Sequence, residues 1–196
     1  MDIIRVMSEF RFIDEDASLH EMLAFLEKYP RFSVDLESDS FHHYAERIAL
    51  VQIAAGGRVF IVDPLRVEIM PLAPLFADVS REKVFHDADY DGRMILTSLG
   101  VRPGPVFDTM IAARVLGKQR VGLADLLEEY FGLSVDKGFQ KADWARRPLE
   151  ADMLAYAAMD VAYLLPLRDR MEEEMERLGR LAWAREEFDR LVRELE

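Results

Sequence analysis

Acidic side chains with regular spacing are the residues of this sequence that could do chemistry. In the stretch FSVDLES, strand alternation places Asp35 and Glu37 on the same side. Two carboxylates in this arrangement could bind one hard cation, or they could simply form the solvent-exposed face of a strand. In YAAMDVAYLLPL, helix periodicity places Tyr156 one turn before Asp160, the lone charge of an apolar run. Burying an unpaired carboxylate is costly, so we expect Asp160 to pair with an arginine or to bind a metal ion.

A further group of acids, in HDADYD, follows directly after the apolar, strand-like run KVF. Open α/β sheets place their sites at strand ends, so Asp87, Asp89 and Asp91 are candidates for a metal ligand and for the cap of the next helix. We interpret His86 as a packing or hydrogen-bonding residue rather than a metal ligand. Asp108, between a strand and a helix, is predicted to be an N-cap.

The elements that position these acids begin with strands and end with helices. Alternation and turn residues predict strands at residues 31–38, 47–54 and 58–64, which form an antiparallel meander. Strands and helices then alternate as far as Asp108, after which the pattern is helical, including one long helix at residues 150–178. We therefore expect an α/β fold in which a mixed sheet is flanked by helices and the C-terminal part is helical.

The composition limits the class of protein. With 196 residues, 51% of them hydrophobic, the chain can form one domain with a sizeable core. It has no cysteine, which excludes disulfides and thiolate metal sites and suits a cytoplasmic location. No apolar run has the length of a membrane span, so no membrane partner is expected. The net charge of −12 argues against nucleic acid, although residues 114–147 carry seven basic side chains against five acidic ones.

Taken together, the acidic segments resemble the motifs of the DEDDy class of 3'-5' exonucleases, and within it the ribonuclease D branch. VDLES is similar to the first motif, FHDADYDGRMI to the second and YAAMD to the third. GLADLLEEYFGL, DKGFQKADW and RRPL are similar to a block of that branch, although the family usually has serine where Ala142 stands. The resemblance implies a DnaQ-like, ribonuclease H-like fold, with one exonuclease domain over residues 1–196 and without C-terminal helical nucleic-acid-binding repeats.

The resemblance also implies roles for individual residues. Four acids would hold two divalent cations, Mg²⁺ or Mn²⁺. These acids are Asp35, Glu37, Asp91 and Asp160. Tyr156 would orient the attacking water. Lys137 and Gln140 match a K-x-x-Q pattern of the branch and would contact the terminal nucleotides of the substrate.

The implied activity is hydrolysis of phosphodiester bonds from the 3' end of single-stranded RNA, with release of nucleoside 5'-monophosphates. Two other hypotheses stay open: a 3'-5' exonuclease that acts on DNA with the same metals, and an inactive nuclease fold that binds RNA. The acidic surface predicts weak, salt-sensitive binding of short single strands rather than of duplexes. The oligomeric state is not predicted.

Overall fold

The structure is a computed structural model that describes residues 10–39, 47–135 and 138–195. Its centre is a six-stranded mixed sheet with the strand order β1-β4-β3-β2-β5-β6. The strands are β1 (Phe10–Ile13), β2 (Arg31–Ser38), β3 (Ile48–Ala55), β4 (Arg58–Val62), β5 (Glu82–Phe85) and β6 (Val106–Asp108). Strands β2, β3 and β4 form the predicted antiparallel meander, β1 joins β4 in parallel, and β5 and β6 extend the other edge in parallel with β2.

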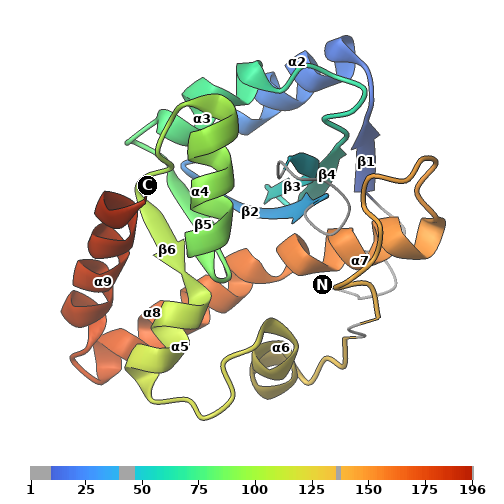
Figure 1. Ribbon diagram of the computed structural model, residues 1–196. Helices are drawn as coiled ribbons and strands as arrows, with labels where there is room; N and C mark the ends of the chain where they lie inside the picture. The colour runs from blue at the N-terminus through green and yellow to red at the C-terminus, as the bar shows by residue number, and fades with distance from the viewer. Residues whose placement is uncertain (1–9, 40–46, 136–137, 196) are drawn as a thin grey trace.

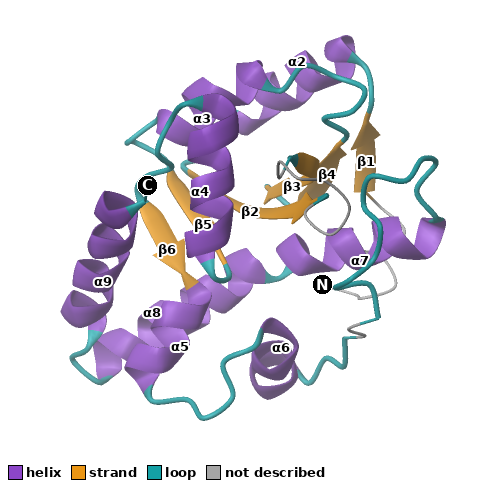
Figure 2. Cartoon of the chain, viewed as in Figure 1, coloured by secondary structure: helices purple, strands orange, loops and turns teal. Residues whose placement is uncertain are grey.

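Helices cover both faces of this sheet. They are α2 (Asp16–Leu26), α3 (Ala73–Ala77), α4 (Ala88–Leu99), α5 (Thr109–Leu116), α6 (Leu123–Phe131), α7 (Ala151–Ala162), α8 (Leu164–Arg177) and α9 (Leu181–Glu194), with a 3-10 helix at Met70–Leu72. In Figure 1, α2 and α3 lie above the strands and α7 and α8 below them, and Figure 2 shows the strands enclosed by helices. No helix in the described part of the chain has the length and apolar character needed to cross a membrane.

Alternation along the central strands divides the core into two halves. In β3, Leu50 and Ala54 face the side covered by α7 and α8, whereas Val51 and Ile53 face the side of α2, α3 and α4. All residues of β3 are buried. A polar side chain on either face of the central strands therefore lies inside the protein, where it needs a partner.

The long helix predicted at residues 150–178 is in fact two helices, so that prediction is wrong. Helix α7 ends at Ala162 and α8 begins at Leu164, with Tyr163 between them at φ −106° and ψ −2°. Pro166 explains the break, because proline has no N–H to donate to the carbonyl of Ala162 and its ring clashes with that carbonyl. Helix α7 packs on β2, β3 and β4, while α8 packs on β5 and α5.

Small side chains bring α7 close to β2. Ala157 and Ala158 are fully buried on the inner side of the helix, so no bulky side chain separates it from the sheet. The hydroxyl of Ser33 in β2 donates a hydrogen bond to the carbonyl oxygen of Val161 at 2.8 Å. Asp160, the neighbour of Val161, is thereby held beside the second half of β2.

Candidate active site

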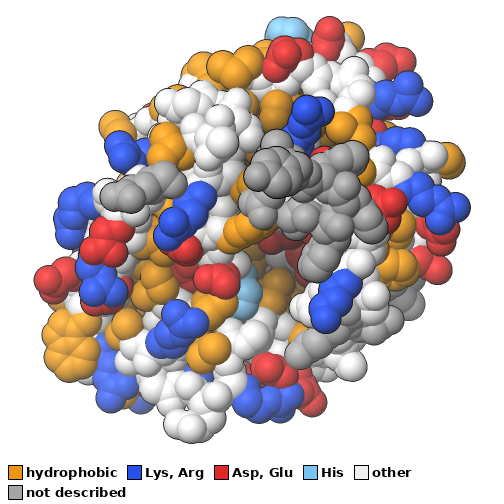
Figure 3. Space-filling model, in the orientation of Figure 1, with side chains coloured by type: hydrophobic (Ala, Val, Ile, Leu, Met, Phe, Trp, Pro, Cys, Tyr) orange, Lys and Arg blue, Asp and Glu red, His pale blue; other side chains and the backbone are white. Residues whose placement is uncertain are grey.

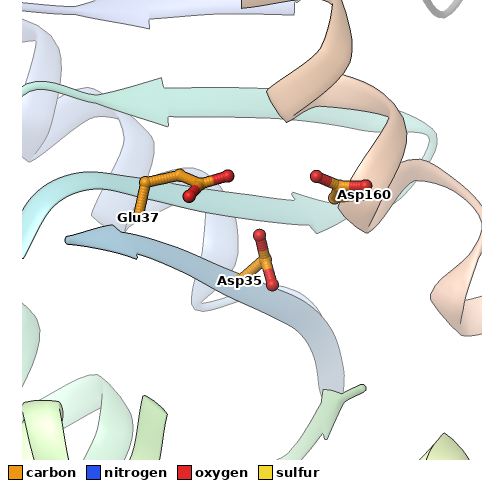
Figure 4. Close-up of side chains that lie close together, drawn as sticks. All are labelled: Asp35, Glu37 and Asp160. Atoms are coloured by element: carbon orange, nitrogen blue, oxygen red, sulfur yellow. The ribbon is translucent and has the colours of Figure 1, made fainter. Parts of the chain in front are cut away.

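Three carboxylates converge between β2 and α7. Asp35 and Glu37 lie on the face of β2 that is covered by α7, and Asp160 reaches toward them from the helix. One carboxylate oxygen from each residue lies within 4.8 Å of the other two. Figure 4 shows the three side chains directed into a shared space. Residues from distant parts of the sequence thus form one acidic cluster.

Asp91 lies beside this cluster, in the first turn of α4. Its side chain is buried and accepts a hydrogen bond from the backbone N–H of Leu36. Asp91 is not one of the residues whose oxygens lie within 4.8 Å of one another. Repulsion from Asp35 nevertheless raises the pKa of Asp91, as it does for Glu37 and Asp160. Asp35 is therefore the carboxylate that the other three share as a neighbour.

The electrostatics of the four carboxyl groups are unfavourable without a cation. Burial raises the pKa of Asp35 to about 7, and burial together with the other carboxylates raises the pKa of Glu37 to about 10. The pKa values of Asp91 and Asp160 also lie well above the ordinary value, first because of burial. Within the described residues, no lysine or arginine compensates any of the four. Because oxygen donors suit Mg²⁺ and Mn²⁺, this donor set fits divalent cations.

Tyr156 lies one helical turn before Asp160 and hydrogen-bonds to its carboxylate. The rings of Phe139 and Trp144 pack against it, with centroid distances of 5.9 Å and 6.2 Å. Burial, and then the charge of Asp160, raises the pKa of the Tyr156 hydroxyl, so the hydroxyl stays protonated at neutral pH. Tyr156 can therefore donate a hydrogen bond at the site but cannot act as a base there.

A cavity of about 370 Å³ opens over these groups. Besides Asp35, Glu37, Asp160 and Tyr156, its walls include His86 after β5, Met110 of α5, the start of α6, and Gln140. In Figure 3 this face of the molecule is hollowed near its middle, and red carboxylates are visible inside the hollow. Gln140 thus lies in the same cavity as the acids, whereas Lys137 lies outside the described residues.

The cap of α4 does not come from the acids in HDADYD, so the expectation that one of them caps the helix is wrong. Asp87 occupies the cap position in a left-handed conformation, φ 68°, but its side chain makes no capping hydrogen bond. Asp108 accepts hydrogen bonds from the N–H groups of Ala88 at 2.7 Å and of Met110 at 2.7 Å and Ile111 at 3.0 Å. The predicted cap at Asp108 is confirmed, and it serves both α4 and α5 because their preceding strands are neighbours.

Several basic side chains between residues 114 and 147 are paired with acids. The pairs are Lys118 with Glu129 and Glu174, Arg120 with Asp125 and Glu128, Arg146 with Glu150, and Arg147 with Asp63. The excess of basic residues in this stretch therefore provides less free positive charge than the sequence indicates.

Two features of the site were not recognised from the sequence. Gln52 of β3 lies directly opposite Asp35, fully buried, and its amide nitrogen and oxygen have no partner among the described residues. Its only signal is a polar letter inside the apolar run ALVQIA. The predicted hydrogen bond of His86 is formed, with Thr109, but the ring also lines the cavity.

Residues 10–176 match the family model of a 3'-5' exonuclease. Ribonuclease D from Sphingobium indicum is 35% identical over 183 residues, which are 91% of this chain and 47% of that protein. The crystal structure of Escherichia coli RNase D, described as an exoribonuclease involved in structured RNA processing, matches with a TM-score of 0.88 and 31% identity over 94% of this chain and 50% of that one. The chain thus spans about half the length of these relatives.

A smaller protein matches over most of its own length. The structure of Brucella melitensis NrnC bound to pGG has a TM-score of 0.79 and 28% identity, covering 94% of this chain and 90% of that one. A second structure of the same protein contains Mg²⁺. These similarities confirm the predicted ribonuclease H-like fold.

Proposed function

Because the chain belongs to the 3'-5' exonuclease family, we propose that it hydrolyses phosphodiester bonds from the 3' end of single-stranded RNA and releases nucleoside 5'-monophosphates. The observation that carries this proposal is the group of four carboxylates, three of which line an open cavity together with Tyr156 and none of which has a compensating lysine or arginine among the described residues. A binding module has no need for such a group, because it destabilises the fold unless cations occupy it.

We assign the four carboxylates to two cation sites. Glu37, Asp160 and Asp35 would hold one ion, because their oxygens lie within 4.8 Å of one another, and Asp91, which interacts with Asp35, would help to hold the other. Two divalent cations, when bound, would activate a water and stabilise the charge on the leaving oxygen. Mg²⁺ and Mn²⁺ are the ions that suit an all-oxygen donor set.

The protein side chains would contribute orientation. Tyr156 keeps its proton and donates it to the carboxylate of Asp160, so its hydroxyl oxygen would accept a hydrogen bond from the attacking water. The rings of Phe139 and Trp144 pack against the tyrosine ring and restrict its orientation. Gln140, on the wall of the cavity, would contact the terminal nucleotides, and Lys137 is proposed for the same role from the sequence pattern alone.

Short single-stranded oligoribonucleotides are the substrate class that we favour. The cavity is small, about 370 Å³. A net charge of −12 disfavours contacts with many successive phosphates of a long strand. The match to NrnC bound to pGG supports this class, because nearly the whole of that chain is covered. DNA is the alternative substrate, since the same carboxylates and their cations could promote hydrolysis of the phosphodiester bond in either nucleic acid. A cytoplasmic location stays a prediction from composition.

The test is a degradation assay with 5'-labelled single-stranded RNA and DNA of the same sequence, in Mg²⁺, in Mn²⁺ and in EDTA. We expect a ladder that shortens from the 3' end of the RNA, disappears in EDTA and is reduced at least about 100-fold in Asp160→Asn. Asp152→Asn is the matched control, because Asp152 is exposed two turns earlier on the same helix. Intact RNA with both metals and a folded protein would favour the RNA-binding module instead.

A further inference from the structure

The imidazole of His86 is held in one orientation by a chain of hydrogen bonds. The hydroxyl of Thr109 donates to the carbonyl oxygen of Phe85 at 3.0 Å, and Nδ1 of His86 lies 2.9 Å from the same hydroxyl oxygen. A threonine hydroxyl has one proton; because this proton is directed to the carbonyl, we assign the donor role in the second contact to Nδ1. Thr109 is fully buried, which fixes the ring. The other ring nitrogen, Nε2, therefore carries a lone pair.

This lone pair is available at neutral pH. Burial lowers the pKa of His86 to about 4; the negative charge of Asp87 opposes this shift, and the positive charge of Arg114 adds a smaller effect in the same direction as burial. The ring is therefore neutral, with its one proton on Nδ1. No residue in the described part of the chain donates a hydrogen bond to Nε2.

The position of His86 points to substrate rather than to metal. His86 lines the cavity that also contains Asp35, Glu37, Tyr156 and Asp160, but it is not a member of the group that could share an ion. A phosphate oxygen would be repelled by the lone pair, because both are acceptors. The partner of Nε2 must be a donor, and among the backbone groups of a nucleic acid only the sugar hydroxyls donate.

We propose that Nε2 of His86 accepts a hydrogen bond from the 2'-hydroxyl of a nucleotide at the 3' end of bound RNA, and that this residue distinguishes RNA from DNA. The proposal rests on the function proposed above and names the sugar class of its substrate. Two other donors give different outcomes. The terminal 3'-hydroxyl is present in DNA as well, so as the partner it would leave 2'-deoxy sugars without effect, and an amino group of a base would make degradation depend on sequence. DNA lacks the 2'-hydroxyl and would leave Nε2 without a partner.

The test combines changes in the protein with single-atom changes in the substrate. Oligoribonucleotides with one 2'-deoxy sugar at the last, second-last or third-last position are compared with all-ribose RNA. The proteins are wild type, His86→Asn and His86→Gln. Asparagine places an amide near Nδ1 and keeps a partner for Thr109, but it has nothing at Nε2. Glutamine places an amide oxygen near Nε2. Comparing the two variants separates the loss of the acceptor at Nε2 from the loss of the packing contacts of the imidazole ring.

In the wild type we expect one of the deoxy positions to lower kcat/KM by about 10-fold, the usual effect of one lost hydrogen bond. In His86→Asn, the deoxy substitution at that position should not lower kcat/KM relative to all-ribose RNA. In His86→Gln, most of the wild-type difference between the two substrates should remain. Binding of the same oligonucleotides, measured by fluorescence anisotropy with Ca²⁺ in place of Mg²⁺, should follow the same pattern and does not depend on turnover.

An equal deoxy effect in wild type and His86→Asn would overturn the role of His86 and leave the exoribonuclease intact. A loss that follows the terminal base rather than the sugar would overturn the assignment to the 2'-hydroxyl. Failure of the wild type to bind or degrade any of the RNAs would overturn the proposed function, and this inference with it.

Discussion

The carboxylate of Asp108 accepts a hydrogen bond from the backbone N–H of Ala88 at 2.7 Å, so the end of β6 caps the helix that follows β5. The same carboxylate caps α5, the helix that follows its own strand. Asp91 sits in the first turn of α4, so one side chain determines how this helix presents an acid to the site.

Replacing Asp108 with alanine should therefore cost more than the loss of one cap. We expect the free energy of unfolding to fall by about 2 to 4 kcal/mol, because two helices lose their N-terminal acceptor. Urea unfolding followed by circular dichroism measures this. Asp89→Ala, at an exposed position of the same helix paired with Arg93, should cost no more than about 0.5 kcal/mol. Equal losses for the two variants would contradict the double cap.

The sequence was informative wherever the signal is local. Strand β2 has the predicted bounds, because alternation of Phe32, Val34 and Leu36 with polar residues is a property of the strand itself. The same alternation put Asp35 and Glu37 on one face. It could not show that α7 covers that face, since this depends on how the helix packs on the sheet.

The errors arose where contacts are not local. The cap of α4 comes from a residue 20 positions later in the sequence, and only the pairing of β5 with β6 brings it there. The basic residues near α6 looked available for nucleic acid, but Lys118 is held by Glu174, far along the chain. The break before α8 is different, because Pro166 was a local signal that the periodicity of the surrounding residues obscured.

Tyr156→Phe is expected to lower kcat while leaving the affinity for metal unchanged. The hydroxyl is the only group lost, and the ring contacts with Phe139 and Trp144 stay. A loss of about 10- to 100-fold in kcat, with little change in KM, fits a hydroxyl that orients a water. Mn²⁺ titration by calorimetry checks the metal sites. A variant that loses Mn²⁺ binding would show that the tyrosine supports the carboxylates instead.

The stability of the metal-free protein should fall as the pH rises from about 6.5 to 8. The pKa of Asp35 is raised to about 7 and that of Glu37 to about 10, so the folded protein holds protons that the unfolded chain has already lost above pH 4 to 5. The free energy of unfolding decreases with pH when the folded state binds more protons. The lowered pKa of His86, about 4 instead of 6.5, affects the slope only below this range, and that of Lys83, lowered to about 8, begins to oppose the slope only at its upper end.

Urea midpoints measured in EDTA across this pH range would show the slope. Saturating Mg²⁺ should flatten or reverse it, because ionised carboxylates bind the metal. Asp35→Asn should reduce the slope in EDTA by removing one of the shifted groups. A slope that is the same with and without metal would indicate that the four acids do not form a cation site.

Arg147 and Asp63 form a buried ion pair that holds the segment before α7 against the sheet. The guanidinium donates to both Asp63 oxygens, at 2.6 Å and 2.7 Å, and also to the carbonyl oxygens of Trp144 and Ala49 at 2.6 Å and 2.9 Å. Trp144 packs against Tyr156. Arg147→Met should therefore lower the free energy of unfolding by about 3 to 5 kcal/mol, because the buried carboxylate of Asp63 is left without its positive partner.

Adding Asp63→Asn to this variant separates stability from catalysis. The double variant should recover part of the stability, because the unpaired buried charge is gone. We expect kcat to be below the wild-type value in both the single and the double variant. In both, the carbonyls of Trp144 and Ala49 lack their donor, so the Trp144 ring that packs against Tyr156 is no longer fixed. Urea unfolding and steady-state kinetics on one RNA substrate measure the two effects. Recovery of kcat together with stability would show that the ion pair acts only on the fold and does not position Tyr156.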